Sequence, residues 1–307
     1  MEFNVLISDD FINICSNEKI IVKENKKIVS FLNDFEDGKW RTNKFNSFIW
    51  DNIAETALNY QERQALFDKS QQKLVAAAKN LRLASENDEI GRGSEIAEIM
   101  LYAIMKNYYK ALPVVPKIYY KQNSQDNAKG ADSVHIVVSG DEYSLWFGEA
   151  KFFNGLNDSS FYQITNSLYN ALQTEKLKKE NSIILGVRDL QYSGLDQHLI
   201  DKITKDLSPK NSIDNIKKII NIPIMVIHEC DITKNKNHYN DEYIDRMREM
   251  YFEQINSYFS KQYNKLGGMN LYNLIKFHLI LFPVPEKKRI VDRFMKQVKF
   301  YKEEAED

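Results

Sequence analysis

The stretch from Gly130 to Phe153 reads GADSVHIVVSGDEYSLWFGEAKFF, and it decides the fold. Two largely apolar runs, 132–138 and 143–152, favour β-strands, and the four residues between them, Ser139-Gly-Asp-Glu142, have the composition of a tight turn. The sequence therefore predicts a β-hairpin. Charged residues interrupt the apolar pattern near one end of this hairpin, and they indicate its chemistry.

Three charged side chains are expected to meet at that end. Asp132 opens the first strand, and Glu149 and Lys151 lie two residues apart on the second strand, so that both project to the same face. A hairpin places the start of one strand beside the end of the other. Asp132 should therefore lie next to the segment Glu149-Ala-Lys151.

This combination of side chains suits metal-dependent hydrolysis. Carboxylates that converge on one point raise one another's pKa unless a cation neutralises them. Mg²⁺ is such a cation, with Mn²⁺ as an alternative, because it binds through one or two carboxylates and keeps several waters. The carbonyl of Ala150 would add a neutral ligand, and Lys151 would orient or deprotonate the attacking water and offset charge on a phosphate. The predicted reaction is hydrolysis of a phosphodiester.

A structural interpretation of the same residues stays open. The tripeptide [DE]-x-K has little weight alone, since it also occurs at 24–26, 37–39 and 286–288. Only the copy at Glu149 lies in an apolar strand, where burial of Glu and Lys is unfavourable without a reason. A salt bridge between Glu149 and Lys151 would be such a reason. The residues alone leave an active site and a structural ion pair evenly balanced.

The flanking segments predict an α/β core. An amphipathic helix follows Ser94, which suits an N-cap, and it carries Glu95 and Glu98 in its first turn. Glu95 would supply a further carboxylate to the hairpin site, and Glu98 competes for that role. The other expected elements are strands at 114–120, 182–187 and 222–227 and a helix at 161–179. Together they predict a mixed sheet flanked by helices.

Length and composition set wider limits. We expect three regions in the 307 residues: an N-terminal α+β region at 1–85 for docking a partner, a nuclease-like core at 86–232, and a C-terminal helical segment at 233–307. With 42 basic and 43 acidic residues, the chain is not a histone-like binder of nucleic acid. Two cysteines exclude a disulfide scaffold. The sequence has no membrane-spanning run and no signal-peptide pattern, so we expect a cytoplasmic protein without membrane contact.

Two further patterns concern ligands. The string His228-Glu-Cys-Asp231 follows a strand-like run whose side chains alternate between faces, so we expect no metal site there. Lys117, Lys121 and Lys129 surround a polar loop next to the hairpin; contact with the phosphate backbone of DNA and a merely solvated surface stay about equally open for it. The basic segment 287–296 is more typical of a solvated helix face.

The motifs resemble those of the PD-(D/E)XK nuclease superfamily. The stretches that carry the resemblance are Gly91-Arg-Gly-Ser-Glu95, Gly130-Ala-Asp132 and Gly148-Glu-Ala-Lys151. The resemblance implies a restriction-endonuclease-like core whose metal site is formed by Glu95, Asp132, Glu149 and Lys151.

Two positions depart from the superfamily pattern. Ala131 precedes Asp132 where proline is frequent, which leaves the chemistry intact. Gln163 matches a glutamine that often follows E-x-K in the superfamily, but Ser167 stands where the usual tyrosine partner of that glutamine would be.

More narrowly, three stretches resemble the HamA family, the nuclease subunits of Hachiman anti-phage defence systems: GRGSEIAE at 91–98, KGADSVH at 129–135 and WFGEAKF at 146–152. The resemblance covers residues 85–230 and implies a DNA endonuclease that a partner helicase, HamB, restrains until infection. The sequence has no P-loop, which fits a separate ATP-driven subunit. Two other functions stay open: a non-catalytic adaptor that holds a helicase or nucleic acid, and a stand-alone restriction or repair nuclease.

Overall fold

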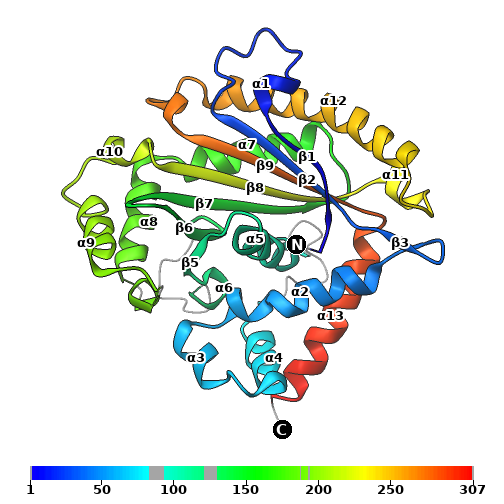
Figure 1. Ribbon diagram of the computed structural model, residues 1–307, viewed down its shortest axis with the longest axis horizontal. Helices are drawn as coiled ribbons and strands as arrows, with labels where there is room; N and C mark the ends of the chain where they lie inside the picture. The colour runs from blue at the N-terminus through cyan, green and yellow to red at the C-terminus, as the bar shows by residue number, and fades with distance from the viewer. Residues whose placement is uncertain (1, 83–92, 121–129, 187, 193, 306–307) are drawn as a thin grey trace.

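A mixed β-sheet forms the centre of the molecule (Figure 1). The computed structural model describes residues 2–82, 93–120, 130–186, 188–192 and 194–305, and within these ranges the sheet has seven strands in the order β1-β2-β9-β8-β7-β6-β5. The strands are β1 (Asn4–Asp10), β2 (Lys26–Leu32), β5 (Leu112–Val115), β6 (Ser133–Ser139), β7 (Glu142–Phe153), β8 (Ile220–Glu229) and β9 (Lys276–Val284). The four inner strands β2, β9, β8 and β7 run parallel, and the edge pairs are antiparallel.

Helices cover both faces of this sheet (Figure 1), which confirms the expected α/β architecture. One face packs against α2 (Thr42–Ala57), α4 (Ser70–Lys79), α5 (Ser94–Asn107) and α13 (Lys287–Glu303). The other face packs against α7 (Asp158–Ala171), α8 (Thr174–Gly186), α9 (Gln197–Asp206) and α12 (Asp241–Leu266). Inner strands with both faces covered need continuous apolar sequence, and nine of the ten residues of β8 are buried.

Several short elements connect these layers. They are α1 (Phe11–Ile14), β3 (Phe35–Glu36), β4 (Lys39–Trp40), α3 (Tyr60–Ala65), α6 (Lys117–Tyr120), α10 (Ile213–Lys217), α11 (Asp231–Lys234), and the 3₁₀ turns Arg188–Tyr192 and Tyr272–Leu274. No helix of the described residues is both long and apolar enough to cross a membrane.

Three sequence-based expectations about elements were wrong. The strand expected at 182–187 is the second half of α8, because a short apolar run cannot by itself distinguish a buried strand from a buried helix. The helix expected at 161–179 is accordingly two helices, α7 and α8. The strand expected at 114–120 ends at Val115, and the chain after Pro116 turns into α6.

The C-terminal region also differs from its expectation. Residues 276–284 form β9, a central strand, where a mainly helical segment was expected. β9 pairs with both β2 and β8, so the sheet combines strands from all three of the regions expected from the sequence. The predicted strand at 222–227 is confirmed as part of β8.

Helix α5 approaches β7 closely at Gly148. A Cβ atom on Gly148 would lie 2.1 Å from Oγ of Ser133 and 2.6 Å from Cδ2 of Leu101 in α5. Only glycine leaves room for this contact, since real Cβ atoms essentially never come so near to another heavy atom. The contact fixes α5 against the hairpin, one residue before Glu149.

Candidate active site

The hairpin brings Asp132 to the segment that contains Glu149 and Lys151. β6 and β7 pair with Ser133 opposite Gly148, as the turn chemistry predicted. The N–H of Asp132 donates to the carbonyl of Gly148 at 2.8 Å. The N–H of Ala150 donates to Oδ2 of Asp132 at 3.0 Å. Two hydrogen bonds therefore fix the backbone and the carboxylate of Asp132 relative to β7.

Lys151 connects the two carboxylates. Its Nζ lies 4.0 Å from Oδ2 of Asp132 and forms an ion pair with Oε1 of Glu149. The Glu149 side chain is 7% exposed and that of Lys151 30%, so the cluster is buried on one side and reaches solvent through the lysine. We call Asp132, Glu149 and Lys151 the acid–lysine cluster.

The charges in the cluster shift one another's pKa. Burial raises the pKa of Glu149, and the nearby Asp132 carboxylate raises it further, while Lys151 and a hydrogen bond from Ser167 oppose the shift. Burial alone would lower the pKa of Lys151, but the charges of Glu149 and Asp132 outweigh it and raise the pKa above its ordinary value. Lys151 is therefore a cation at neutral pH, and two carboxylates share its charge.

The charges of the two acids of α5 act on different lysines. Glu95 and Glu98 are both buried. The charge of Glu98 makes a smaller contribution to the raised pKa of Lys151. Burial lowers the pKa of Lys302 in α13, and the charge of Glu95 opposes that shift. Both acids of α5 stay candidates for the helix carboxylate of the site.

Helix α5 begins against α13. Ser94 was expected to be the N-cap, but the N-cap is Gly93, whose φ of 88° lies in the left-handed region that favours glycine. A Cβ on Gly93 would lie 2.9 Å from Cγ2 of Val291 in α13. Glu95 and Glu98 are three residues apart in this helix and so share one of its sides.

Helix α7 adds a contact that the sequence did not predict. Oγ of Ser167 donates a hydrogen bond to Oε1 of Glu149. Gln163, one turn earlier in α7, is half-buried. In the sequence Ser167 differs from the superfamily pattern, and its spacing of four residues from Gln163 indicates that both share one helix face.

Of the three lysines expected to contact DNA, the structure describes Lys117. Lys117 is fully buried, and its Nζ donates to Oε2 of Glu180 at 2.7 Å, so it does not reach the surface and its expected role does not hold. Lys121 and Lys129 lie outside the described residues.

Glu180 is a second residue that the sequence did not single out. Its other oxygen, Oε1, accepts the N–H of Ala131 at 2.9 Å. A Cβ on Gly130 would lie 1.6 Å from the same oxygen, so glycine is required there. The buried ion pair of Lys117 and Glu180 therefore holds the backbone directly before Asp132. A cavity of about 250 Å³, whose lining includes Glu149, Ser167, Lys176 and Glu180, lies beside the cluster.

The donor set fits a hard divalent ion bound through few protein ligands. Among the described residues, no group of three or more His, Cys, Asp and Glu side chains is arranged to hold a metal. In the string 228–231, Nε2 of His228 lies 2.9 Å from the hydroxyl oxygen of Tyr251, and Cys230 is buried. Asp132 and Glu149 form a two-carboxylate site, and Mg²⁺ is commonly held by one or two carboxylates with waters completing its shell.

Comparison with known proteins places the chain in a family. None of the curated proteins compared with the chain matches it. The family model HamA matches residues 9–298, which is nearly the whole chain and includes the hairpin, α5, and the strands on both sides of the cluster. The chain belongs to the HamA family.

Proposed function

We propose that this chain is a metal-dependent DNA endonuclease of the PD-(D/E)XK type and the effector subunit of a Hachiman defence complex. Membership of the HamA family makes it a Hachiman defence protein. The observation that carries the nuclease proposal is the convergence of the Asp132 and Glu149 carboxylates on the ammonium group of Lys151.

The two carboxylates would hold Mg²⁺, and Glu98 of α5 would add negative charge to the site from the other side of β7. When bound, Mg²⁺ supplies positive charge that acidifies water and neutralises a phosphate oxygen. The backbone N–H of Ala150 already orients Oδ2 of Asp132. The Ala150 carbonyl is the neutral ligand expected from the sequence and belongs to the same proposal.

Lys151 would act on the phosphate. Its ammonium group is compact, carries three donors and is partly exposed, so it can approach an anionic oxygen while its stem stays packed. A pKa above the ordinary value keeps it charged at neutral pH. In this arrangement Lys151 donates hydrogen bonds to the phosphate as negative charge builds up, and Ser167 orients the buried Glu149.

A purely structural ion pair explains less of this arrangement. Glu149 and Lys151 alone would neutralise each other, yet Asp132 adds a second carboxylate that raises the pKa of Glu149. Two carboxylates that converge on one ammonium group suit a site for Mg²⁺, which is commonly held by one or two carboxylates.

The test is cleavage of supercoiled plasmid by the purified full chain, with Mg²⁺ and with a chelator. It is carried out with the chain alone and with the helicase subunit co-expressed. The second preparation is needed because, in the proposed complex, the helicase subunit controls the activity of the nuclease. We expect Mg²⁺-dependent nicking or linearisation that Asp132→Asn abolishes. If no preparation cleaves, or if Asp132→Asn cleaves at the unmodified rate, the chain is an adaptor or has its site elsewhere.

A further inference from the structure

A large basic cleft lies where α2 and α13 begin, beside the hairpin formed by β3 and β4. Its volume is about 800 Å³. The charged side chains that line it are seven cations and three acids: Lys39, Arg41, Lys44, Lys234, Lys236, Arg289 and Arg293, with Glu36, Asp37 and Glu286. The whole chain has a net charge of −1, so this excess of positive charge is local. We call this feature the basic cleft.

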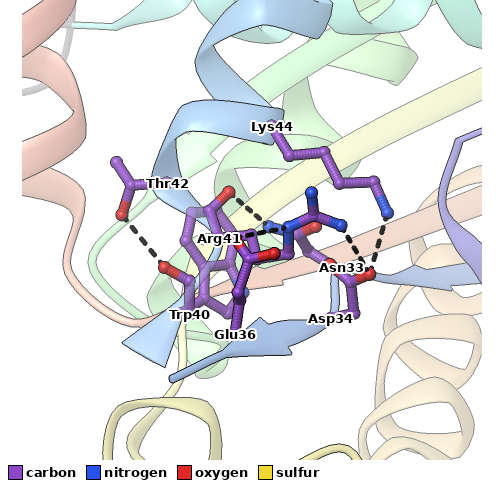
Figure 2. A network of polar contacts seen from close by, with 7 residues as sticks. All are labelled: Asn33, Asp34, Glu36, Trp40, Arg41, Thr42 and Lys44. Carbon is purple, nitrogen blue, oxygen red and sulfur yellow. Dashed lines mark hydrogen bonds and ion pairs between the residues drawn. The ribbon is translucent and has the colours of Figure 1, made fainter. Parts of the chain in front are cut away.

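A polar network holds one wall of the basic cleft in place (Figure 2). Oδ2 of Asp34 accepts from Nη1 of Arg41 at 3.1 Å and from Nζ of Lys44 at 3.3 Å. Nε of Arg41 lies 3.6 Å from Glu36, and Nδ2 of Asn33 donates to the carbonyl of Arg41 at 3.0 Å. These contacts tie the β3–β4 hairpin to the start of α2. The wall is therefore preorganised before any ligand arrives.

Three other cations of the cleft differ from those of this wall. Within the described ranges, Lys39, Arg289 and Arg293 form no ion pair. Arg289 and Arg293 are four residues apart in α13 and so lie on one helix face. Guanidinium groups in such a row match phosphate oxygens, because each presents a planar fork of donors.

Two further features of the cleft are the starts of its helices and the side chain of Trp40. Both α2 and α13 start there without a hydrogen bond from an N-cap side chain, and the positive ends of their dipoles add to the local potential. Trp40, which lines the cleft, is 8% exposed, and its buried indole N–H has no partner among the described residues. A buried donor without an acceptor is unusual in a folded protein.

We infer that the basic cleft binds the phosphate backbone of nucleic acid, as a second contact for the DNA that reaches the acid–lysine cluster. The inference rests on the proposed function for the identity of that DNA. The cleft lies at the carboxyl ends of the parallel strands β2, β8 and β9, and the cluster lies toward the same end of β7. Lys287, which follows Glu286 of the cleft, joins α13 to these strand ends, since its Nζ donates to the carbonyl of Phe152 in β7 and its N–H to Glu229 in β8.

An acidic protein segment fits the cleft less well. Protein–protein interfaces are depleted of charged residues at their centre and anchored by buried aromatic and aliphatic side chains. The lining of the basic cleft is mostly charged or polar, and its apolar members are Trp40, Pro285 and Ile290. A polyanion that contacts several separate cations, as a nucleic-acid strand does, matches this lining better.

The test is binding of a fluorescein-labelled DNA duplex to the full chain, without metal, measured by anisotropy between about 50 and 200 mM salt. Every protein in the assay carries Glu149→Gln, so that cleavage cannot interfere. The test variant adds Arg289→Glu and Arg293→Glu. The matched control adds Lys205→Glu and Lys210→Glu, which make the same change of charge at exposed positions near α9, far from the cleft in the fold (Figure 1).

We expect the test variant to weaken DNA binding about tenfold or more, and to reduce the slope of log affinity against log salt by about 2, while the control changes little. Equal effects of both pairs, or no DNA binding by the parent protein, would overturn the inference. So would loss of binding to a poly-glutamate peptide with unchanged DNA binding, which would identify an acidic protein as the ligand. Because binding is measured without metal, the nuclease proposal can fail in the plasmid assay while this result stands.

Discussion

Nζ of Lys151 lies 4.0 Å from Oδ2 of Asp132, although the two residues come from different strands of the hairpin. The same ammonium group pairs with Glu149, so one cation is shared by two carboxylates. This relationship depends on the register in which Ser133 faces Gly148, because a shift by one residue would move Glu149 and Lys151 to the opposite face of the sheet.

The hydrogen bond from Ser167 should matter for activity rather than for stability. Ser167→Ala removes the donor that orients Glu149 and leaves the half-buried helix face otherwise intact. Loss of a hydrogen bond that orients a metal-binding side chain commonly lowers activity or metal affinity by about 10-fold. We expect that loss in the initial rate of plasmid cleavage. Ser159→Ala, at an exposed position of the same helix, is the control and should cleave at the unmodified rate.

The buried pair of Lys117 and Glu180 should show a stability effect that a second substitution relieves. Lys117→Met leaves the Glu180 carboxylate buried without its cation and should lower the free energy of unfolding by about 3–5 kcal/mol. Adding Glu180→Gln removes the charge but keeps an oxygen for the N–H of Ala131. Urea denaturation should therefore find the double variant more stable than the single one. If the single and the double variant were equally stable, the buried charge of Glu180 would not be the cause of the destabilisation.

The contact between α5 and β7 predicts that alanine substitution destabilises the protein at one glycine and not at another. Gly148→Ala places a Cβ within 2.6 Å of Leu101 and closer still to Ser133, so either the helix or the hairpin must move. We expect the free energy of unfolding to fall by about 1–3 kcal/mol, and the variant to lose its cleavage activity. At Gly155 an added Cβ meets no atom within 4 Å, so Gly155→Ala should fold as the parent does. Similar thermal unfolding of both variants would argue against the close approach.

Buried histidines should make the protein less stable in mild acid. Burial lowers the pKa of His228 to about 4. The unfolded chain takes up a proton there near pH 6.5, but the folded chain does so only near pH 4. The free energy of unfolding therefore falls as the pH is lowered through this window.

A variant isolates that contribution. His228→Gln keeps a polar partner for Tyr251 but cannot titrate. When the pH is lowered from 6.5 to 4, the free energy of unfolding of the variant should fall less than that of the parent. The difference between the two proteins should reach about 3 kcal/mol. Denaturation curves recorded across this pH range check the difference, and parallel curves for the two proteins would show that His228 does not contribute.

The sequence predicted the parts of the site that depend on local periodicity. Alternation along β7 placed Glu149 and Lys151 on one face, and the turn chemistry placed Asp132 beside them. Glu95 and Glu98 could not be distinguished in this way, because they are three residues apart in one helix and therefore share a face.

Other features were beyond sequence reasoning for similar reasons. Ser167 and Glu180 reach the hairpin only because α7 and α8 pack on that face of the sheet. The strand β9 could not be predicted, because its apolar run ends in Pro283-Val-Pro285 and prolines at such a place are equally typical of a helix end. The basic cleft combines residues from three distant segments, whose joint charge emerges only from the fold.

The most direct test compares two acids on one strand. Glu149→Gln removes a carboxylate of the acid–lysine cluster, whereas Glu142→Gln makes the same change at the exposed, opposite end of β7. The initial rate of Mg²⁺-dependent plasmid cleavage is measured for both in the preparation in which the parent protein is active. We predict that Glu149→Gln falls at least about 100-fold and that Glu142→Gln keeps the parent rate. Cleavage by Glu149→Gln at the rate of Glu142→Gln would show that the cluster is a structural ion pair and not the active site.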